Sequence, residues 1–240
     1  GGNDSMDTAL KMERAALQLG YDLRVMGIPK TVDNDLPETH HCPGYGSAAR
    51  YVATSVREAG LHTEAMYTSE TVTVLVTVGR NTGWLAAASG LARMERSDAP
   101  HLICFPEITF SPDRFLGDVE DVFRLLGGAF IVSGEGLVDG EGHYVSANAG
   151  DVSTDAFGHP ELGGVGEYLK RLIEGRLGLH TRAIRPDICQ QCAMHIASLT
   201  DRDEGVMVGR DAVRYAVQGH SGEMVTLVVP PGERYHCTTG

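Results

Sequence analysis

Two carboxylates lie two residues apart in a polar loop that follows a short apolar run. Asp33 and Asp35 flank Asn34, and Lys30 precedes them. In this spacing one carboxylate can act as a base for a hydroxyl nucleophile while the second orients it or holds a divalent cation. A lysine beside two carboxylates can balance phosphoryl oxygens. The alternative is an Asx-turn whose side chains satisfy backbone amides and do no chemistry.

Two further polar groups follow predicted strands. Arg80 comes directly after the β-branched run 71–78, and Glu107 follows the apolar run 102–105. An arginine at a strand end can clamp a phosphate in bidentate fashion and offset the charge that develops during transfer. Taken alone, Arg80 is as compatible with a surface ion pair, and Glu107 with simple solvation. Three polar strand ends at one edge of a sheet together favour a site there.

Three other motifs are weaker. Residues 44–49 match the spacing of a dinucleotide-binding glycine loop, but no hydrophobic strand precedes them, so we do not expect dinucleotide binding. Cys189 and Cys192 have the spacing of a redox or zinc pair, yet their context favours two buried or inert thiols. His40 and His41 have no metal-ligand partner at helical spacing, which favours a polar turn.

The elements that must position these groups alternate between strands and helices along the 240 residues. Apolar and β-branched runs predict strands at 23–28, 71–78, 102–105 and 129–133. Helical periodicity predicts helices at 6–17, 47–59, 84–93, 113–126, 165–175 and 203–218, with a glycine- and acid-rich loop over 139–164. This alternation is typical of a doubly wound α/β fold, in which ligands bind beyond the carboxyl ends of the strands.

Composition argues against several classes of partner. The chain has 20 Lys+Arg against 32 Asp+Glu, a formal charge of −12, which disfavours nucleic acid and anionic membrane surfaces. No apolar run approaches the roughly 18 residues of a transmembrane helix. Five unevenly spaced cysteines predict reduced thiols and a cytoplasmic location. Phosphate chemistry remains possible, because only one cleft has to be basic.

Taken together, the motifs resemble those of the phosphofructokinase family, and more closely its pyrophosphate-dependent branch. Residues 29–35 resemble P-K-T-I-D-N-D and residues 78–84 resemble M-G-R-x-x-G-W, which are the most specific matches. Weaker matches follow the family order over almost the whole chain, at 1–5, 44–48, 106–107, 134–136 and 196–213.

The resemblance implies a three-layer α/β/α fold with two similar domains and the active site in the cleft between them. We expect the first domain at about 1–43 with a return near 195–230, and the second at 44–194. The chain starts abruptly, which implies that the amino-terminal part and the carboxyl-terminal end of the family are missing. This piece alone is therefore expected to be inactive, and the intact protein is expected to be a homodimer or homotetramer.

The resemblance also implies an activity, the transfer of phosphate from pyrophosphate to the 1-hydroxyl of fructose 6-phosphate with Mg²⁺ as cofactor. The implied catalytic residues are Asp33 as the base, Arg80 and Lys30. The implied substrate-binding residues are Thr31, Asp35, Gly79, Glu107 and Arg182. The implied donor-binding residues are Gly2, Asp4, Ser5 and Lys30, and the implied metal-binding residues are Asn3 and Asp35. A carboxylate at Asp4 would crowd and repel the α-phosphate of ATP, so pyrophosphate is the expected donor.

Several positions depart from the family pattern. Asn3 stands where the family has an aspartate linked to magnesium, and Gln191 replaces an arginine. Thr71 lies near a position that supplies an arginine to a neighbouring subunit's substrate, and Ile188 replaces a polar or aromatic residue. These departures leave two alternatives open. The first is the same chemistry with a changed reactant, either an unphosphorylated sugar or polyol as acceptor or ATP as donor. The second is a weak or inactive homologue that binds phosphometabolites as a regulatory subunit.

Overall fold

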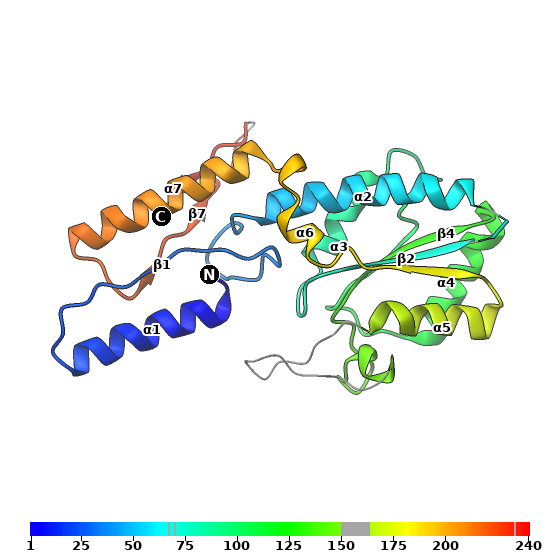
Figure 1. The fold of residues 1–240 in the computed structure, drawn as a ribbon, viewed down its shortest axis with the longest axis horizontal. Coiled ribbons are helices and arrows are strands. Elements are labelled where there is room, and N and C mark those ends of the chain that lie inside the picture. Colours follow the sequence, from blue (N-terminus) through cyan, green and yellow to red (C-terminus); the bar gives the residue numbers. More distant parts are fainter. Residues whose placement is uncertain (67, 70, 150–163, 233) are drawn as a thin grey trace. The chain divides into compact units, whose positions relative to one another are not determined.

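The computed structural model describes residues 1–66, 68–69, 71–149, 164–232 and 234–240 (Figure 1). The chain forms two compact units. The smaller unit contains residues 1–47 and 195–240, and the larger unit contains residues 48–194. Among the described residues, none of the helices combines the length and the apolar character that crossing a membrane requires.

The larger unit is built on a four-stranded sheet of the order β3-β4-β2-β5. The strands are β2 (Val72–Thr77), β3 (Leu102–Cys104), β4 (Ala129–Gly134) and β5 (Thr181–Ile184). All neighbours in this sheet are parallel, so the carboxyl ends of the four strands share one edge. Every residue of β2 and β4 is buried, as expected for apolar runs covered on both faces.

Helices cover both faces of this sheet. Val72, Val74 and Val76 pack in one core with residues of α4 (Pro112–Leu126) and α5 (Val165–Leu177). On the opposite face, Thr73 hydrogen-bonds to Thr63 of α2 (Tyr45–Ala65), and Figure 1 shows α2 and α5 on opposite sides of the strands. The prediction of an α/β fold is confirmed, and the larger unit has the three layers that it implied.

The smaller unit has long helices and very short strands. Its helices are α1 (Asn3–Gln18) and α7 (Leu199–Gln218). The strand β1 (Met26–Gly27) pairs in parallel with β6 (Glu223–Met224), and β7 (Leu227–Val228) pairs antiparallel with β8 (Thr238–Thr239). A small core of Val208, Ala212, Val225 and Leu227 joins α7 to these strands. The strand predicted at 23–28 is therefore only two residues long, and the side chains of Leu23 and Ile28 are exposed.

Several boundaries differ from the predicted ones. The helix α2 begins two residues before and ends six residues after the predicted helix 47–59. The helix α3 (Trp84–Ala88) passes into a 3₁₀ turn, Ser89–Ala92. The strand β5 and the short helix α6 (Cys189–Cys192) were not predicted. Of the predicted loop 139–164, residues 150–163 lie outside the described residues, and Val145–Ala149 form a 3₁₀ turn.

Candidate active site

A loop that carries Arg80 follows β2 at the carboxyl edge of the sheet. We call residues 78–83 the arginine loop. Three of its backbone N–H groups donate to side chains from other segments of the unit: Val78 to Gln190 Oε1 (3.2 Å), Gly79 to Glu135 Oε1 (3.3 Å) and Gly83 to Glu107 Oε1 (2.8 Å). Two of these acceptors are carboxylates, which make the stronger hydrogen bonds. The backbone on both sides of Arg80 is thereby fixed.

Glycines allow this loop to close tightly. Gly79 has a φ of +126°, and a Cβ there would lie 2.4 Å from the carbonyl oxygen of Thr82. Gly136, in the turn after β4, packs directly on the loop, because a Cβ there would lie 1.6 Å from the carbonyl oxygen of Arg80. No other residue type fits at these two positions without a shift of backbone.

Glu107 has a structural role in addition to any contact with substrate. Its Oε1 accepts from Gly83, while the side chain as a whole remains exposed at the strand end.

The sequence did not indicate Glu135 or Gln190 as anchors of the arginine loop. Glu135 lies in the Gly-Glu-Gly turn that the resemblance included, so a signal existed for it. Nothing near Gln190 indicated a bond to Val78, which is more than a hundred positions away.

In the smaller unit, the first turn of α1 meets the loop that carries the aspartates. The Asn3 side-chain amide donates to Asp35 Oδ2 at 2.7 Å, and the backbone N–H of Lys30 donates to Gly1 at 3.1 Å. A Cβ on Gly2 would lie 3.7 Å from the Lys30 carbonyl oxygen. The structure therefore brings the predicted donor-binding turn together with Lys30 and Asp35.

The charges at this helix start oppose each other. The N–H groups of a first helical turn attract anions, and the exposed Lys30 adds a positive charge. Asp4 lies in the same first turn and is exposed, as is Ser5. An anion bound here would therefore have to tolerate a neighbouring carboxylate.

The three residues Asp33, Asn34 and Asp35 have different structural roles. The Asp33 N–H donates to Thr31 Oγ1 at 3.2 Å. Asn34 has a φ of +55°, and its side-chain oxygen accepts from the N–H of Cys42 at 2.8 Å. The turn is therefore held by Thr31 and Asn34, and the carboxylate of Asp35 accepts from a side chain instead of closing an Asx-turn.

The segment after the aspartates is anchored on α7. His41 Nε2 lies 2.8 Å from Glu204 Oε2, and the hydroxyl of Tyr235 donates to Glu204 Oε1. Burial, and then the hydrogen bond to Glu204, raise the pKa of Tyr235. His41 and Glu204 are both largely buried, so the polar turn expected at His40 and His41 is only half correct. His41 is an interior partner of Glu204, while His40 remains exposed.

The glycine motif at 44–49 forms the start of α2, and its amides already bind a carboxylate of this chain. Asp201 accepts from the N–H of Gly44 (2.6 Å), the N–H of Ser47 (3.2 Å) and the Ser47 hydroxyl (2.5 Å). This helix start is where a dinucleotide motif would bind phosphate. Asp201 therefore occupies the amides of Gly44 and Ser47 that a phosphate would contact at this helix start.

The residues predicted to bind a metal provide oxygen donors that suit magnesium. No group of three or more His, Cys, Asp or Glu residues capable of holding a metal occurs in the described part of the chain. Mg²⁺ is usually held by one or two carboxylates together with substrate phosphates, and it does not need a protein cage. Asp35 with the neighbouring Asn3 fits that pattern, although Asn3 contributes no charge.

Thr71 and Arg182 lie near the amino ends of the strands, whereas Arg80 follows a carboxyl end. Thr71 directly precedes β2, and Arg182 pairs with Thr73, near the amino end of that strand. A strand of six residues spans roughly 20 Å, so Arg182 is far along the sheet from the arginine loop of its own unit. The structure does not bring Arg182 to Arg80.

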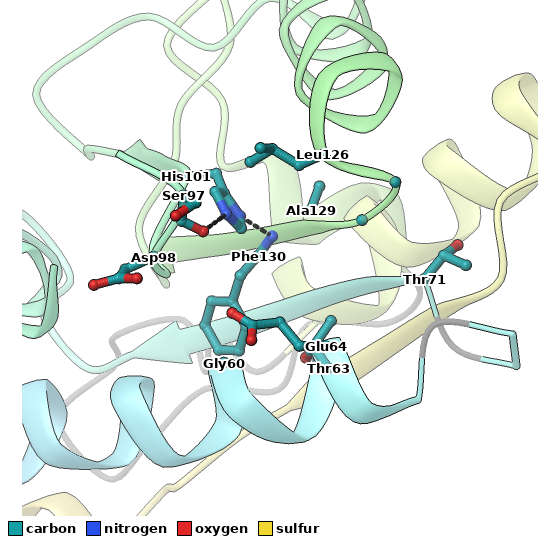
Figure 2. Close-up of a pocket in the computed structure, with 12 residues that line it drawn as sticks. Gly60, Thr63, Glu64, Thr71, Ser97, Asp98, His101, Leu126, Ala129 and Phe130 are labelled. Atoms are coloured by element: carbon teal, nitrogen blue, oxygen red, sulfur yellow. Dashed lines mark hydrogen bonds between the residues drawn. The ribbon is translucent and has the colours of Figure 1, made fainter. Parts of the chain in front are cut away.

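A cavity of about 350 Å³ also lies at this amino edge, between the end of α2 and the start of β4. Figure 2 shows His101 in its wall, where Nδ1 accepts from the N–H of Phe130 at 2.8 Å and Nε2 donates to the carbonyl of Ser97 at 3.0 Å. The described residues that line it include Glu64 and Asp98 and no lysine or arginine. An acidic lining does not favour a phosphorylated ligand in this cavity.

Two positions that depart from the family pattern lie in and beside α6. Ile188 precedes this helix and is 67% exposed, and Gln191 lies within it and is also exposed. Cys189 and Cys192 are both exposed free thiols. The prediction of two buried or inert thiols is wrong about burial, because α6 presents both side chains to solvent while Gln190 alone in this helix is buried.

Comparison with known proteins gives one consistent result. The phosphofructokinase family profile matches residues 1–216. The chain is 45% identical over 235 residues to pyrophosphate–fructose 6-phosphate 1-phosphotransferase of Xanthomonas campestris pv. campestris (strain B100), covering 98% of this chain and 54% of that protein. It is 44% identical over 229 residues to the protein of the same name from Methylococcus capsulatus, covering 95% and 54%.

A solved structure agrees with these sequence matches. The crystal structure of pyrophosphate-dependent phosphofructokinase from Marinobacter aquaeolei matches with a TM-score of 0.85 and 38% identity, covering 100% of this chain and 56% of that chain. The chain thus spans about half the length of the relatives it matches.

Proposed function

Because the chain belongs to the phosphofructokinase family, we propose that it forms part of an enzyme that transfers a phosphoryl group from pyrophosphate to the 1-hydroxyl of fructose 6-phosphate. The observation that carries this proposal is the hydrogen bond from Asn3 to Asp35, next to Lys30, since it joins the predicted donor-binding turn to the loop that carries Asp33 and Asp35. The names of relatives that are 44–45% identical support the choice of donor and acceptor.

In the proposed reaction, Asp33 takes the proton of the 1-hydroxyl as that oxygen attacks the phosphoryl group. Thr31 and Glu107 hold the sugar, and Gly79 and Arg80 offset the negative charge that develops during transfer. Mg²⁺, when bound through Asp35 and Asn3, would neutralise charge on the pyrophosphate oxygens. The fixed backbone of the arginine loop supports the role of Arg80, because preorganised charge needs no rearrangement during the reaction.

The choice of donor depends on the first turn of α1. Pyrophosphate would lie against the amides of Gly2 and Ser5, with Lys30 balancing its charge. Asp4 lies in that turn, where its carboxylate would repel the additional phosphate of a nucleotide. These charges support pyrophosphate over ATP as the donor.

Arg182 supports an assembly of several copies. It lies far along the sheet from Arg80 of its own unit, so it is badly placed to bind the substrate that its own Arg80 would contact. We therefore assign Arg182 to the 6-phosphate of a substrate bound by a second copy, in a homodimer or homotetramer. The same proposal includes a two-domain assignment, with the first domain at 1–43 and about 195–230 and the second at 44–194. It also includes a cytoplasmic location and the inactivity of this piece alone.

A coupled assay of the full-length protein tests the proposed function. Fructose 6-phosphate would be offered with pyrophosphate or ATP, and free fructose and polyols would be offered with pyrophosphate. We expect turnover with pyrophosphate and fructose 6-phosphate to exceed all other combinations. Faster turnover of an unphosphorylated acceptor would favour the alternative that Thr71, Ile188 and Gln191 suggest. A preference for ATP would contradict the role of Asp4, and the absence of metal-dependent turnover would favour a regulatory homologue.

A further inference from the structure

Two exposed thiols flank the buried side chain that anchors the arginine loop. Cys189 and Cys192 are the first and last residues of α6, and both are exposed and unbridged. Gln190 lies between them and is only 2% exposed. Its Oε1 accepts from the N–H of Val78, which immediately precedes Gly79 and Arg80. Gln190 therefore connects α6 by a hydrogen bond to the backbone beside Arg80.

Cys189 and Cys192 are three residues apart on α6, a spacing that a tightened helical turn can bridge by a disulfide. Residues three apart on a helix have Cβ atoms about 5–6 Å apart. A disulfide requires about 3.5–4.5 Å between its Cβ atoms, so closing it has to tighten this turn. At present the Cys192 thiol donates to the carbonyl of Ile188 at 3.2 Å, and the Cys189 N–H donates to Pro186 at 3.0 Å. Disulfide formation would break the first of these bonds and move the backbone that carries Gln190.

We propose that Cys189 and Cys192 form a reversible disulfide, and that its formation withdraws Gln190 from Val78 and loosens the arginine loop. The oxidant is a disulfide, either of a small thiol or of a protein. One cysteine thiolate attacks the oxidant and displaces one thiolate, and the second cysteine then attacks the mixed disulfide and displaces the other. Each displaced thiolate takes up a proton lost by a cysteine, so two cysteines are oxidised and one disulfide is reduced. The effect on catalysis rests on the proposed function.

The remaining thiols are less suited to this exchange. Cys42 is buried, and burial raises the pKa of its thiol. Burial also raises the pKa of Cys104, to about 12. Cys237 is partly exposed, and burial followed by the charge of Glu204 raises the pKa of its thiol. Since only the thiolate takes part in exchange, we expect oxidation to be selective for Cys189 and Cys192.

The experiment places the full-length protein in glutathione buffers that range from fully reduced to fully oxidised. Peptide mass spectrometry would detect the bridge between residues 189 and 192, and hydrogen exchange would follow the amide of Val78. We expect the bridge to form reversibly and the Val78 amide to exchange faster when it is present. The kcat/KM for the sugar phosphate should then fall about 5-fold, the typical effect of one lost hydrogen bond.

Matched variants separate the proposal from other effects. Gln190→Ala should expose the Val78 amide in the reduced protein, whereas Gln191→Ala should not. Cys189→Ser should abolish the redox response, and Cys237→Ser should retain it. Failure of the 189–192 bridge to form, or its formation with no change in Val78 exchange, would overturn the proposal. An enzyme inactive in both redox states contradicts only the proposed function, because the bridge and the exchange of Val78 are measured without substrate.

Discussion

The side-chain amide of Asn3 donates to Asp35 Oδ2 across 2.7 Å, which ties the first turn of α1 to the loop that carries Asp33 and Asp35. Two carboxylates at this separation would repel each other unless a cation lay with them. An amide at position 3 therefore allows the two elements to meet without a metal ion. It also lowers the affinity of any metal site here, because an amide carries one negative charge fewer than a carboxylate.

Replacing Asn3 by aspartate should strengthen metal binding in the full-length enzyme. We expect the Mg²⁺ concentration for half-maximal activity to fall by about tenfold, because Asn3→Asp adds a charged oxygen ligand. A magnesium titration at saturating pyrophosphate measures this. Asn3→Ala is the control, since it removes the hydrogen bond without adding charge and should not lower the requirement. Equal requirements in Asn3→Asp and wild type would exclude Asn3 from the metal site.

Removing the carboxylate of Asp33 should slow the chemical step. Asp33→Ser deletes the proposed base and leaves Lys30, Arg80 and Glu107 in place. We expect kcat to fall by about 10²–10⁴-fold with little change in KM. Steady-state kinetics with a folding check by circular dichroism would measure this. A folded variant that keeps more than about a tenth of wild-type kcat contradicts the assignment.

The neighbouring carboxylate should behave differently. Asp35→Asn keeps the proposed base and removes a proposed metal ligand, so we expect a higher magnesium requirement. The same kinetic assay, repeated over a range of Mg²⁺ concentrations, distinguishes the two aspartates. If Asp33→Ser were rescued by excess magnesium and Asp35→Asn were not, the two roles would have to be exchanged.

Arg182→Gln should weaken substrate binding without slowing chemistry. Loss of a charge-assisted phosphate contact predicts a rise of about 10- to 100-fold in the KM for fructose 6-phosphate, with kcat nearly unchanged. Mixing Arg182→Gln subunits with Asp33→Ser subunits tests whether the arginine serves a second copy. Mixed oligomers should regain activity, because some sites then combine an intact Asp33 with an intact Arg182. The absence of any regain would place Arg182 in the site of its own chain.

Glu204 should matter for stability, because its carboxylate satisfies two groups at once. Glu204→Ala leaves His41 and Tyr235 without this acceptor, which should reduce the free energy of unfolding by about 2–4 kcal/mol. Urea denaturation measures the effect, and Asp203→Ala, at an exposed neighbouring position, should change it by less than about 0.5 kcal/mol. Equal effects of the two variants would show that the anchor on α7 contributes little.

Cys104 gives a prediction about pH. Burial raises the pKa of its thiol to about 12, so the folded protein holds this proton more tightly than the unfolded chain. Its contribution to stability is complete below the ordinary thiol pKa and is lost as the pH rises toward 12. Urea midpoints measured from pH 7 to pH 10 should fall more steeply for wild type than for Cys104→Ala. Parallel curves would show that Cys104 titrates normally.

The sequence predicted the elements whose signal is local. The strand β2 is a run of β-branched residues buried on both faces, and α4 has Ser111 as its N-cap and Gly127 with a φ of +75° at its end. These features lie within a few residues of the element that they define. Their boundaries were accordingly predicted to within about one residue.

The missed features depend on residues far apart in the chain. The early start of α2 follows from capping by Asp201, which comes more than 150 positions later. Gln190 and Glu204 had no local signal of their roles, because their partners Val78 and His41 lie more than 100 positions away in sequence. The strands of the smaller unit have two residues each, too few for any periodicity to be detected.

The contact between Gly136 and the backbone of Arg80 has a consequence for how this protein tolerates genetic variation. Because a Cβ at position 136 would lie 1.6 Å from the Arg80 carbonyl oxygen, every missense change at that codon has to displace the arginine loop. In a saturation mutagenesis screen, position 136 would therefore score with the catalytic positions, although its own side chain is a hydrogen atom. Gly140, which has open space around its Cα, should accept most substitutions in the same screen.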